Sequence, residues 1–144
     1  AFNLKEMMNL KTPVIACVLG EGGSGGALGI GVADRVMMME NAYYSVISPE
    51  GCAAILWKHR QHAPEAAEAM KIAAPDLGKL NLIDEVIPEP RGGAHHDHVK
   101  SATNFRDAVL AQIKQVQSLS TEDMLDQRYQ KFRKFGEWNG DAIA

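Results

Sequence analysis

The feature that most constrains the fold is a glycine-rich stretch over residues 20–31, in which seven of the twelve residues are glycine. A continuous apolar run of strand length, residues 14–19, comes directly before it. A short apolar run is typical of a buried strand, and clustered glycines are typical of a loop. We therefore expect a strand, a glycine loop, and a helix that begins within the glycines and continues for about three turns to Ala33.

A loop of this kind predicts a site whose chemistry comes from backbone amides. Glycine removes side chains, so a ligand can approach the main chain. The start of a helix also directs free N–H groups and the positive end of the helix dipole toward that ligand. Because glycine inside a helix is less favourable than alanine by about 1 kcal/mol, Gly29 and Gly31 further predict close packing of this helix against its neighbours.

The composition is that of an ordinary globular domain: 144 residues, 46% hydrophobic and 23% charged. A formal net charge of -3 gives no strong field that would attract nucleic acid, and no apolar run approaches the length of a membrane span. Cys17 and Cys52 lie in apolar settings, which predicts buried free thiols and a cytoplasmic location. The start at Ala1, without methionine, is typical of a fragment of a longer protein.

Strands and helices alternate up to about residue 90, and only helices follow, which predicts an α/β fold with a helical C-terminal extension. The expected strands are residues 14–19, 35–39, 43–47 and 83–87. The expected helices, besides the one after the glycines, are residues 2–11, 49–58, 64–70, 74–80, 100–117 and 121–135, with a frayed tail from Gly136.

Local signals mark the ends of several helices. Ser48 followed by Pro49 predicts an N-cap and a first helical residue. The helix that they open, through residue 58, is mostly apolar and is expected to be buried. Asn81 is a candidate C-cap, and Ser120 with Asp123 resembles a capping box.

The two C-terminal helices are expected to be amphipathic. The first has an apolar face formed by Phe105, Val109, Ile113 and Val116. The second has Leu125, Tyr129 and Phe132 on one face, and a basic stripe of Arg128, Lys131 and Lys134 on another, which we expect to be solvated.

From the residues alone, three interpretations of the glycine loop are open. The first is a dinucleotide site, because Gly20-x-Gly22-x-x-Gly25 follows a strand and Glu40 stands twenty residues after Gly20. Against it, the strand that ends at Glu40 turns directly into the next strand at Tyr43, where a further crossover helix would be normal.

The second interpretation is a serine nucleophile. Ser24 lies in a Gly-x-Ser-x-Gly pattern, and Asp84 and His95 follow in the chain order of hydrolases. In such enzymes the serine stands at the end of the strand, whereas four residues intervene here. This favours Ser24 as a loop or helix-capping residue.

The third interpretation is an oxyanion hole. The amides of Gly25 and Gly26, at a helix start, could hold a carbonyl oxygen that gains negative charge. No side-chain base is needed near the loop for this chemistry, and no convincing base is present there.

Several motifs resemble one family. They are Gly20–Ala27, Tyr43–Lys58, Leu82–Asp84, Ile87–Pro90 with Gly92–His95, and Arg128-Tyr129 with Lys131-Phe132. Together they resemble the alpha subunit of the bacterial acetyl-CoA carboxylase carboxyltransferase, and the run from Ser45 to Cys52 is the most specific of them. The resemblance extends over nearly the whole chain but covers only the C-terminal part of that subunit.

The resemblance implies a partial crotonase-like ββα superhelix. Residues 1–95 would be the C-terminal part of the carboxyltransferase domain, and residues 96–144 the helical C-terminal extension. It also implies transfer of a carboxyl group from carboxybiotin, held on the biotin carboxyl carrier protein, to acetyl-CoA. The product is malonyl-CoA, in the first step of fatty acid biosynthesis. The partner would be a beta subunit in an alpha2beta2 heterotetramer, with zinc only on that beta partner. ATP would be used by the whole carboxylase and not bound here.

By position in these motifs, Gly25 and Gly26 would be the oxyanion amides that face biotin. The substrate- or biotin-binding residues implied are Gly22, Gly23, Ser24, Ser48, Pro49, Glu50 and Gly51. No metal is expected, because Cys-x-x-Cys is absent and the His95-His96 loop is expected to be solvated. Two alternatives are kept: another crotonase-type acyl-CoA hydratase or isomerase, with Glu50 as its carboxylate, and a non-catalytic dinucleotide-binding or assembly module.

Overall fold

The computed structural model describes residues 2–136 and contains two parallel sheets. The larger sheet has the order β1-β3-β5. Its strands are β1 (Ile15–Val18), β3 (Arg35–Met39) and β5 (Glu85–Ile87). The smaller sheet pairs β2 (Glu21–Gly23) with β4 (Tyr43–Ser45).

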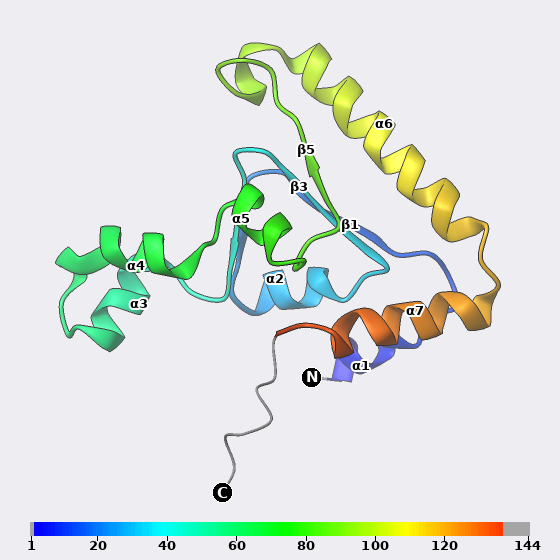
Figure 1. Ribbon diagram of the computed structural model, residues 1–144, viewed down its shortest axis with the longest axis horizontal. Coiled ribbons are helices and arrows are strands. Elements are labelled where there is room, and N and C mark those ends of the chain that lie inside the picture. Colours follow the sequence, from blue (N-terminus) through cyan, green and yellow to red (C-terminus); the bar gives the residue numbers. More distant parts are fainter. Residues whose placement is uncertain (1, 137–144) are drawn as a thin grey trace, which may run out of the picture.

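The chain contributes one strand to each sheet and then forms a helix. This unit occurs first as β1, β2 and α2 (Ser24–Gly31), and then as β3, β4 and α3 (Pro49–Leu56). Figure 1 shows α2 lying beneath the strands of the larger sheet. The two ββα units, with β5 beginning a third, form the α/β superhelical arrangement that the sequence predicts.

The remaining helices lie around these two sheets. They are α1 (Phe2–Met8), α4 (Ala63–Met70), α5 (Ala74–Lys79), α6 (His98–Gln117) and α7 (Thr121–Arg133), with short 3-10 turns η1 (Arg60–His62) and η2 (Ala94–His96). In Figure 1, α6 runs diagonally past the larger sheet, and α7 lies beside α1. The five strands of the described residues all precede residue 88; the domain boundary at residues 95–96 stays a prediction.

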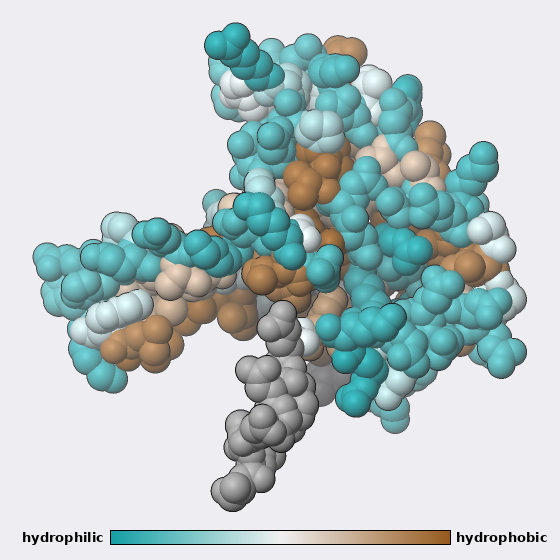
Figure 2. Space-filling model, viewed as in Figure 1, coloured by the Kyte–Doolittle hydropathy of each residue, from teal (hydrophilic) through white to brown (hydrophobic). Residues whose placement is uncertain are grey.

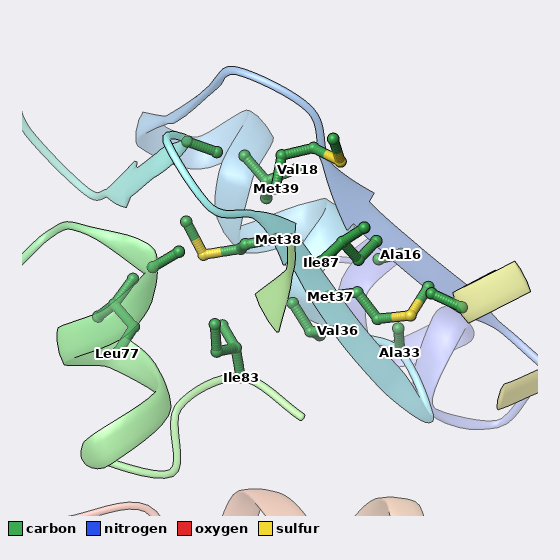
Figure 3. Packing of buried hydrophobic residues seen from close by; sticks show 13 residues of the cluster. Ala16, Val18, Ala33, Val36, Met37, Met38, Met39, Leu77, Ile83 and Ile87 are labelled. Atoms are coloured by element: carbon green, nitrogen blue, oxygen red, sulfur yellow. The ribbon is translucent and has the colours of Figure 1, made fainter. Parts of the chain in front are cut away.

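The hydrophobic core is built on β3, which is buried on both faces, as is usual for a central parallel strand. Met37 and Met38 are fully buried, and their side chains point to opposite sides of the strand (Figure 3). Met38 lies on the side of Leu77 and Ile83, from the α5 region. Phe105 and Val109 of α6 pack against the same cluster, and Val116 is also buried, so the predicted apolar face of this helix is confirmed.

Residues 21–23 differ from the expected glycine loop, because they form strand β2. This strand pairs with β4 in parallel, with Gly22 opposite Tyr44. The helix begins within the glycines as predicted, at Ser24, but it ends at Gly31, before the predicted Ala33. It ends there because the following N–H groups leave the helical pattern: the Ala33 N–H donates to the Gly31 carbonyl, and the Asp34 N–H donates to the Val14 carbonyl just before β1.

The sequence predicts that helix α3 is buried, but the structure shows that most of its residues are exposed or only partly buried. Ile55 is 61% exposed and Leu56 is 65% exposed, whereas Ala53 is fully buried. The reason is that α3 packs chiefly on η1 and α4, and this helical pair projects from the sheets (Figure 1). Hydrophobic residues gather on one side of the projecting pair in Figure 2.

The sequence predicts a solvated basic stripe on α7, but two of its three residues are engaged in ion pairs. Arg128 is 1% exposed, and its guanidinium binds the carboxylate of Asp34. The Lys131 ammonium binds Asp84, and burial is the main cause that lowers the pKa of this lysine. Lys134 is exposed, as predicted.

The two aspartates that bind α7 occupy equivalent positions in the superhelix. Asp34 precedes β3; its N–H donates to the Val14 carbonyl (2.9 Å) and its carboxylate accepts the Val14 N–H (2.7 Å). Asp84 precedes β5 and makes the same two bonds with Val36 (2.8 and 2.6 Å). Neighbouring strands are about 4.8 Å apart, and helix positions i and i+3 are about 5–6 Å apart. This match allows Arg128 and Lys131 to bind the two carboxylates from one helix face.

Several smaller expectations are also settled. The Asp123 N–H donates to the Ser120 hydroxyl at 3.1 Å, which confirms this helix start. Asn81 has a left-handed backbone (φ 56°) after α5, as a C-terminal cap requires. Cys17 and Cys52 are free but only partly buried. Residues 137–144, for which the sequence predicts a frayed tail, lie outside the described residues.

Candidate active site

The candidate site is the start of α2, where the backbone amides are open. Gly23 precedes the helix in an extended conformation and provides no side-chain cap. The first N–H groups of a helix, here including those of Gly25 and Gly26, have no intrahelical partner. Both glycines are exposed, and a Cβ added to either would meet no heavy atom within 4 Å. An acceptor atom can therefore approach both amides.

The sequence favours Ser24 as a cap of the helix, but the capping position of α2 is occupied by Gly23. Ser24 is already within the helix, and its backbone is left-handed, with φ 58°. This conformation is unfavourable for a residue with a side chain, by about 1–3 kcal/mol. The strain is located at the junction of β2 with α2, directly before the two glycine amides.

The second predicted segment, Ser48–Gly51, forms the start of α3. The Gly51 N–H donates to the Ser48 hydroxyl at 3.1 Å, and Pro49 occupies the first turn, so the predicted helix start is confirmed. Gly51 is required by packing, because a Cβ would lie 2.9 Å from Cγ1 of Ile47. The amides of α3 are thus partly satisfied by a side chain, whereas those of α2 are not.

Each strand of the smaller sheet leads into one of the two predicted segments. Strands β2 and β4 are parallel neighbours, with Gly23 opposite Ser45, and each strand leads at its carboxyl end toward a helix. Residues 22–26 thus include the carboxyl end of β2, and residues 48–51 follow the carboxyl end of β4 after residues 46–47.

Acidic groups lie at the other end of this strand pair. Tyr43 is opposite Glu21 in the ladder. A hydrogen bond with the Glu21 carboxylate is the main cause that raises the pKa of Tyr43, and the negative charges of Glu21 and Glu50 act in the same direction. The Tyr43 phenol therefore stays protonated to a higher pH than an isolated tyrosine.

An apolar groove of about 420 Å³ adjoins the start of α2. Ser24, Leu28 and Tyr44 line it from the site side, and Phe132 and Phe135 line it from the C-terminal region. Leu28 is 57% exposed, so α2 presents an apolar surface next to its polar start.

The residues of the other two interpretations are engaged elsewhere. The Asp84 carboxylate binds Lys131 and the Val36 N–H, and the His95 ring packs against His96 at a tilt of 43°, with centroids 4.4 Å apart. Within residues 2–136, no hydrogen bond joins Ser24 to either residue. The Glu40 carboxylate accepts the Glu89 N–H at 3.0 Å, and β3 turns directly into β4, as the sequence predicts.

In the part of the chain that the structure describes, no three or more His, Cys, Asp or Glu side chains are grouped so that they could hold a metal ion. In the same residues, no helix is both long and apolar enough to span a bilayer.

Comparison with known proteins gives the family. Residues 1–136 match the model of the family described as acetyl co-enzyme A carboxylase carboxyltransferase-like. The chain belongs to this family. The acetyl-coenzyme A carboxylase carboxyl transferase subunit alpha of Thermosynechococcus vestitus is 55% identical over 94% of the chain and 42% of its own length. The subunit of the same name from Halalkalibacterium halodurans is 53% identical over 100% of the chain and 45% of its own length. The chain thus spans less than half the length of these relatives.

Solved structures show the same fold at low sequence identity. A Pseudomonas malonate decarboxylase hetero-tetramer in complex with coenzyme A has a chain that superposes with a TM-score of 0.58 at 16% identity. The match covers 88% of this chain and 50% of that one. Transcarboxylase 12S gives a TM-score of 0.56 at 16% identity, over 99% of this chain and 24% of that one. The predicted crotonase-like α/β fold is therefore confirmed.

Two features of this family member were not found by sequence reasoning. One is Tyr44, whose hydroxyl donates a hydrogen bond to the Ala27 carbonyl of α2. The other is Arg128, for which the sequence predicts a solvated side chain and which is buried. The sequence carries one signal for the carboxylate that binds Arg128: Asp34 and Asp84 each stand two residues before a valine in a predicted strand region.

Proposed function

We propose that the protein containing this segment is the alpha subunit of an acetyl-CoA carboxylase carboxyltransferase, active in the cytoplasm with a beta subunit. It would transfer a carboxyl group from carboxybiotin, held on a carrier protein, to acetyl-CoA, and so form malonyl-CoA for fatty acid biosynthesis. Family membership and the names of the relatives support this proposal.

The observation that carries the proposal is the open, uncapped start of α2. Carboxybiotin, when bound, would supply the carboxyl group and a ureido oxygen that gains negative charge when that group leaves. The N–H groups of Gly25 and Gly26 fit such an oxygen, because both residues are exposed and the start of α2 has no side-chain cap. The positive end of the helix dipole adds to the stabilisation. One donor of this kind is worth about 2.7–4 kcal/mol in other enzymes.

The neighbouring residues have supporting roles in this proposal. Gly23 and Ser24 set the direction of the amides, and Ser48–Gly51 forms the adjacent wall on the biotin side. Gly22 is buried in β2, so we assign it to packing under the site and not to contact with substrate. Zinc is assigned to the beta partner, and ATP to another component of the carboxylase.

The test is reverse carboxyl transfer from malonyl-CoA to free biocytin, using the complete alpha subunit assembled with its beta partner. Gly26→Pro removes one amide donor in the first helical turn, where proline is tolerated. We expect kcat to fall by about 100- to 1,000-fold in a variant that still assembles. Gly29→Ala is the matched control, since its Cβ would meet only Leu4 at 3.9 Å, and we expect it to keep full activity. Absence of transfer by the assembled wild type would overturn the proposal.

A further inference from the structure

Tyr44 lies at the junction between β2 and α2, on the strand next to the candidate site. We propose that Tyr44 is a positioning residue, which fixes the angle between β2 and α2 and thereby aims the amides of Gly25 and Gly26. The inference rests on the proposed function, because it assigns those two amides to the reaction.

Tyr44 contacts both sides of this junction. Its backbone pairs with Gly22 of β2 in the parallel ladder. Its hydroxyl donates a hydrogen bond of 2.8 Å to the Ala27 carbonyl, in the first turn of α2. The Tyr44 N–H donates to the Ile72 carbonyl at 3.0 Å, so the strand that carries the ring is itself held from a third segment.

Two glycines make room for the Tyr44 side chain. A Cβ at Gly22 would lie 2.9 Å from Cδ2 of the ring, and a Cβ at Gly31 would lie 2.3 Å from the hydroxyl oxygen. Real Cβ atoms essentially never show contacts this short. The two glycines lie at opposite ends of the β2–α2 unit, and both close approaches are to the same tyrosine. Glycine is unfavourable inside a helix, and its presence at position 31 is explained by the space that the Tyr44 hydroxyl needs.

The backbone strain at Ser24 shows why such support is needed. A left-handed non-glycine residue persists only where its surroundings hold it in place. Ser24 connects β2, on which the Tyr44 ring packs, to the helical turn that accepts the Tyr44 hydrogen bond. Removing that hydrogen bond frees the first turn of α2 to relax, and the two amides turn with it.

The first variant is Tyr44→Phe in the complete alpha subunit assembled with its beta partner. It removes the hydroxyl and keeps the ring. In reverse transfer to biocytin, we expect kcat per assembled enzyme to fall about three- to tenfold with KM for malonyl-CoA unchanged, the range of one neutral hydrogen bond. A purely structural role would lower the yield of assembled enzyme and leave kcat per assembled enzyme at the wild-type value.

The second test is a rescue. Gly31→Ala alone places a methyl group 2.3 Å from the hydroxyl, so we expect a lower melting temperature and a lower kcat. When combined with Tyr44→Phe, the nearest ring atom is Cζ at 3.5 Å, an ordinary contact. The double variant should recover the melting temperature that Gly31→Ala loses, and its kcat should equal that of Tyr44→Phe.

The outcomes separate this inference from the proposed function. If Gly26→Pro inactivates the enzyme but Tyr44→Phe keeps the wild-type kcat, the positioning role is overturned and the proposed function stands. A double variant no more stable than Gly31→Ala would also overturn it. Absence of transfer by assembled wild type would overturn both.

Discussion

The guanidinium of Arg128 and the carboxylate of Asp34 form a buried ion pair through two hydrogen bonds of 2.8 Å. The side chains are 0% and 3% exposed, although the residues lie 94 positions apart in the sequence. The other guanidinium N–H groups donate to main-chain carbonyls at the end of α1 and just after it: Met7, Met8, Leu10 and Thr12. One side chain therefore joins α7, α1 and the edge of the larger sheet.

Arg128→Ala should destabilise the protein strongly, because it leaves the Asp34 carboxylate buried without a cation. Breaking one side of a buried pair costs about 3–5 kcal/mol. The measurement is the free energy of urea unfolding of the complete alpha subunit. Arg133→Ala, at an exposed position on the same helix, should change it by less than about 0.5 kcal/mol. Equal effects of the two variants would contradict the central role of Arg128.

Asp84→Ala should have a smaller but clear effect. It removes the acceptor of the Val36 N–H and the partner of Lys131, but its side chain is 25% exposed, so water can replace part of what is lost. We expect a loss of about 1–3 kcal/mol in the same unfolding measurement. Asp126→Ala, on the exposed side of α7, is the control and should be close to neutral. The prediction fails if Asp84→Ala is as harmless as this control.

The packing of α3 predicts opposite results at neighbouring positions. Ala53 is fully buried, and Ala53→Leu should overpack the contact with α4 and cost about 1–3 kcal/mol. Leu56 is 65% exposed, so Leu56→Gln should change the unfolding free energy of this segment by less than about 0.5 kcal/mol. Thermal unfolding of both variants checks the pair. A large loss from Leu56→Gln would show that this face is covered.

Cys17 should make stability depend on alkaline pH. Burial raises the pKa of its thiol to about 11, with a smaller contribution from the charge of Glu85. Between pH 9 and 11 the unfolded chain loses this proton more readily than the folded one, so unfolding becomes easier as pH rises. The slope for one proton is at most about 1.4 kcal/mol per pH unit. Wild type should therefore lose more stability than Cys17→Ala between these pH values, as measured by urea unfolding; equal losses would contradict the assignment.

Local signals in the sequence were sufficient for much of the fold. The apolar runs of β1 and β3, the Ser48-Pro49 start of α3 and the Ser120 cap depend on neighbouring residues only, and each is present. The open start of α2 is also expected from local signals, because glycines at a helix start provide no side chain to cap its N–H groups.

Features that depend on distant partners were not predicted. Strand β2 consists of Glu21-Gly22-Gly23, which has no hydrophobic alternation, and it forms because β4 offers an edge to pair with. Arg128 has the pattern of a solvated residue on its own helix, and its burial depends on an aspartate far away in the sequence. The position of α3 outside the core is decided by its pairing with α4, which no local pattern specifies.

The ion pair between Arg128 and Asp34 also sets an order of events during synthesis. A growing chain makes Asp34 early, but the cation that neutralises it is 94 residues later. Until α7 has been made, water can solvate the Asp34 carboxylate, so the burial of this charge and its pairing with Arg128 occur together when α7 packs. The N-terminal strands therefore complete their native packing only after α7 is available, and a product cut short before residue 128 should be recognised and degraded as unfolded protein.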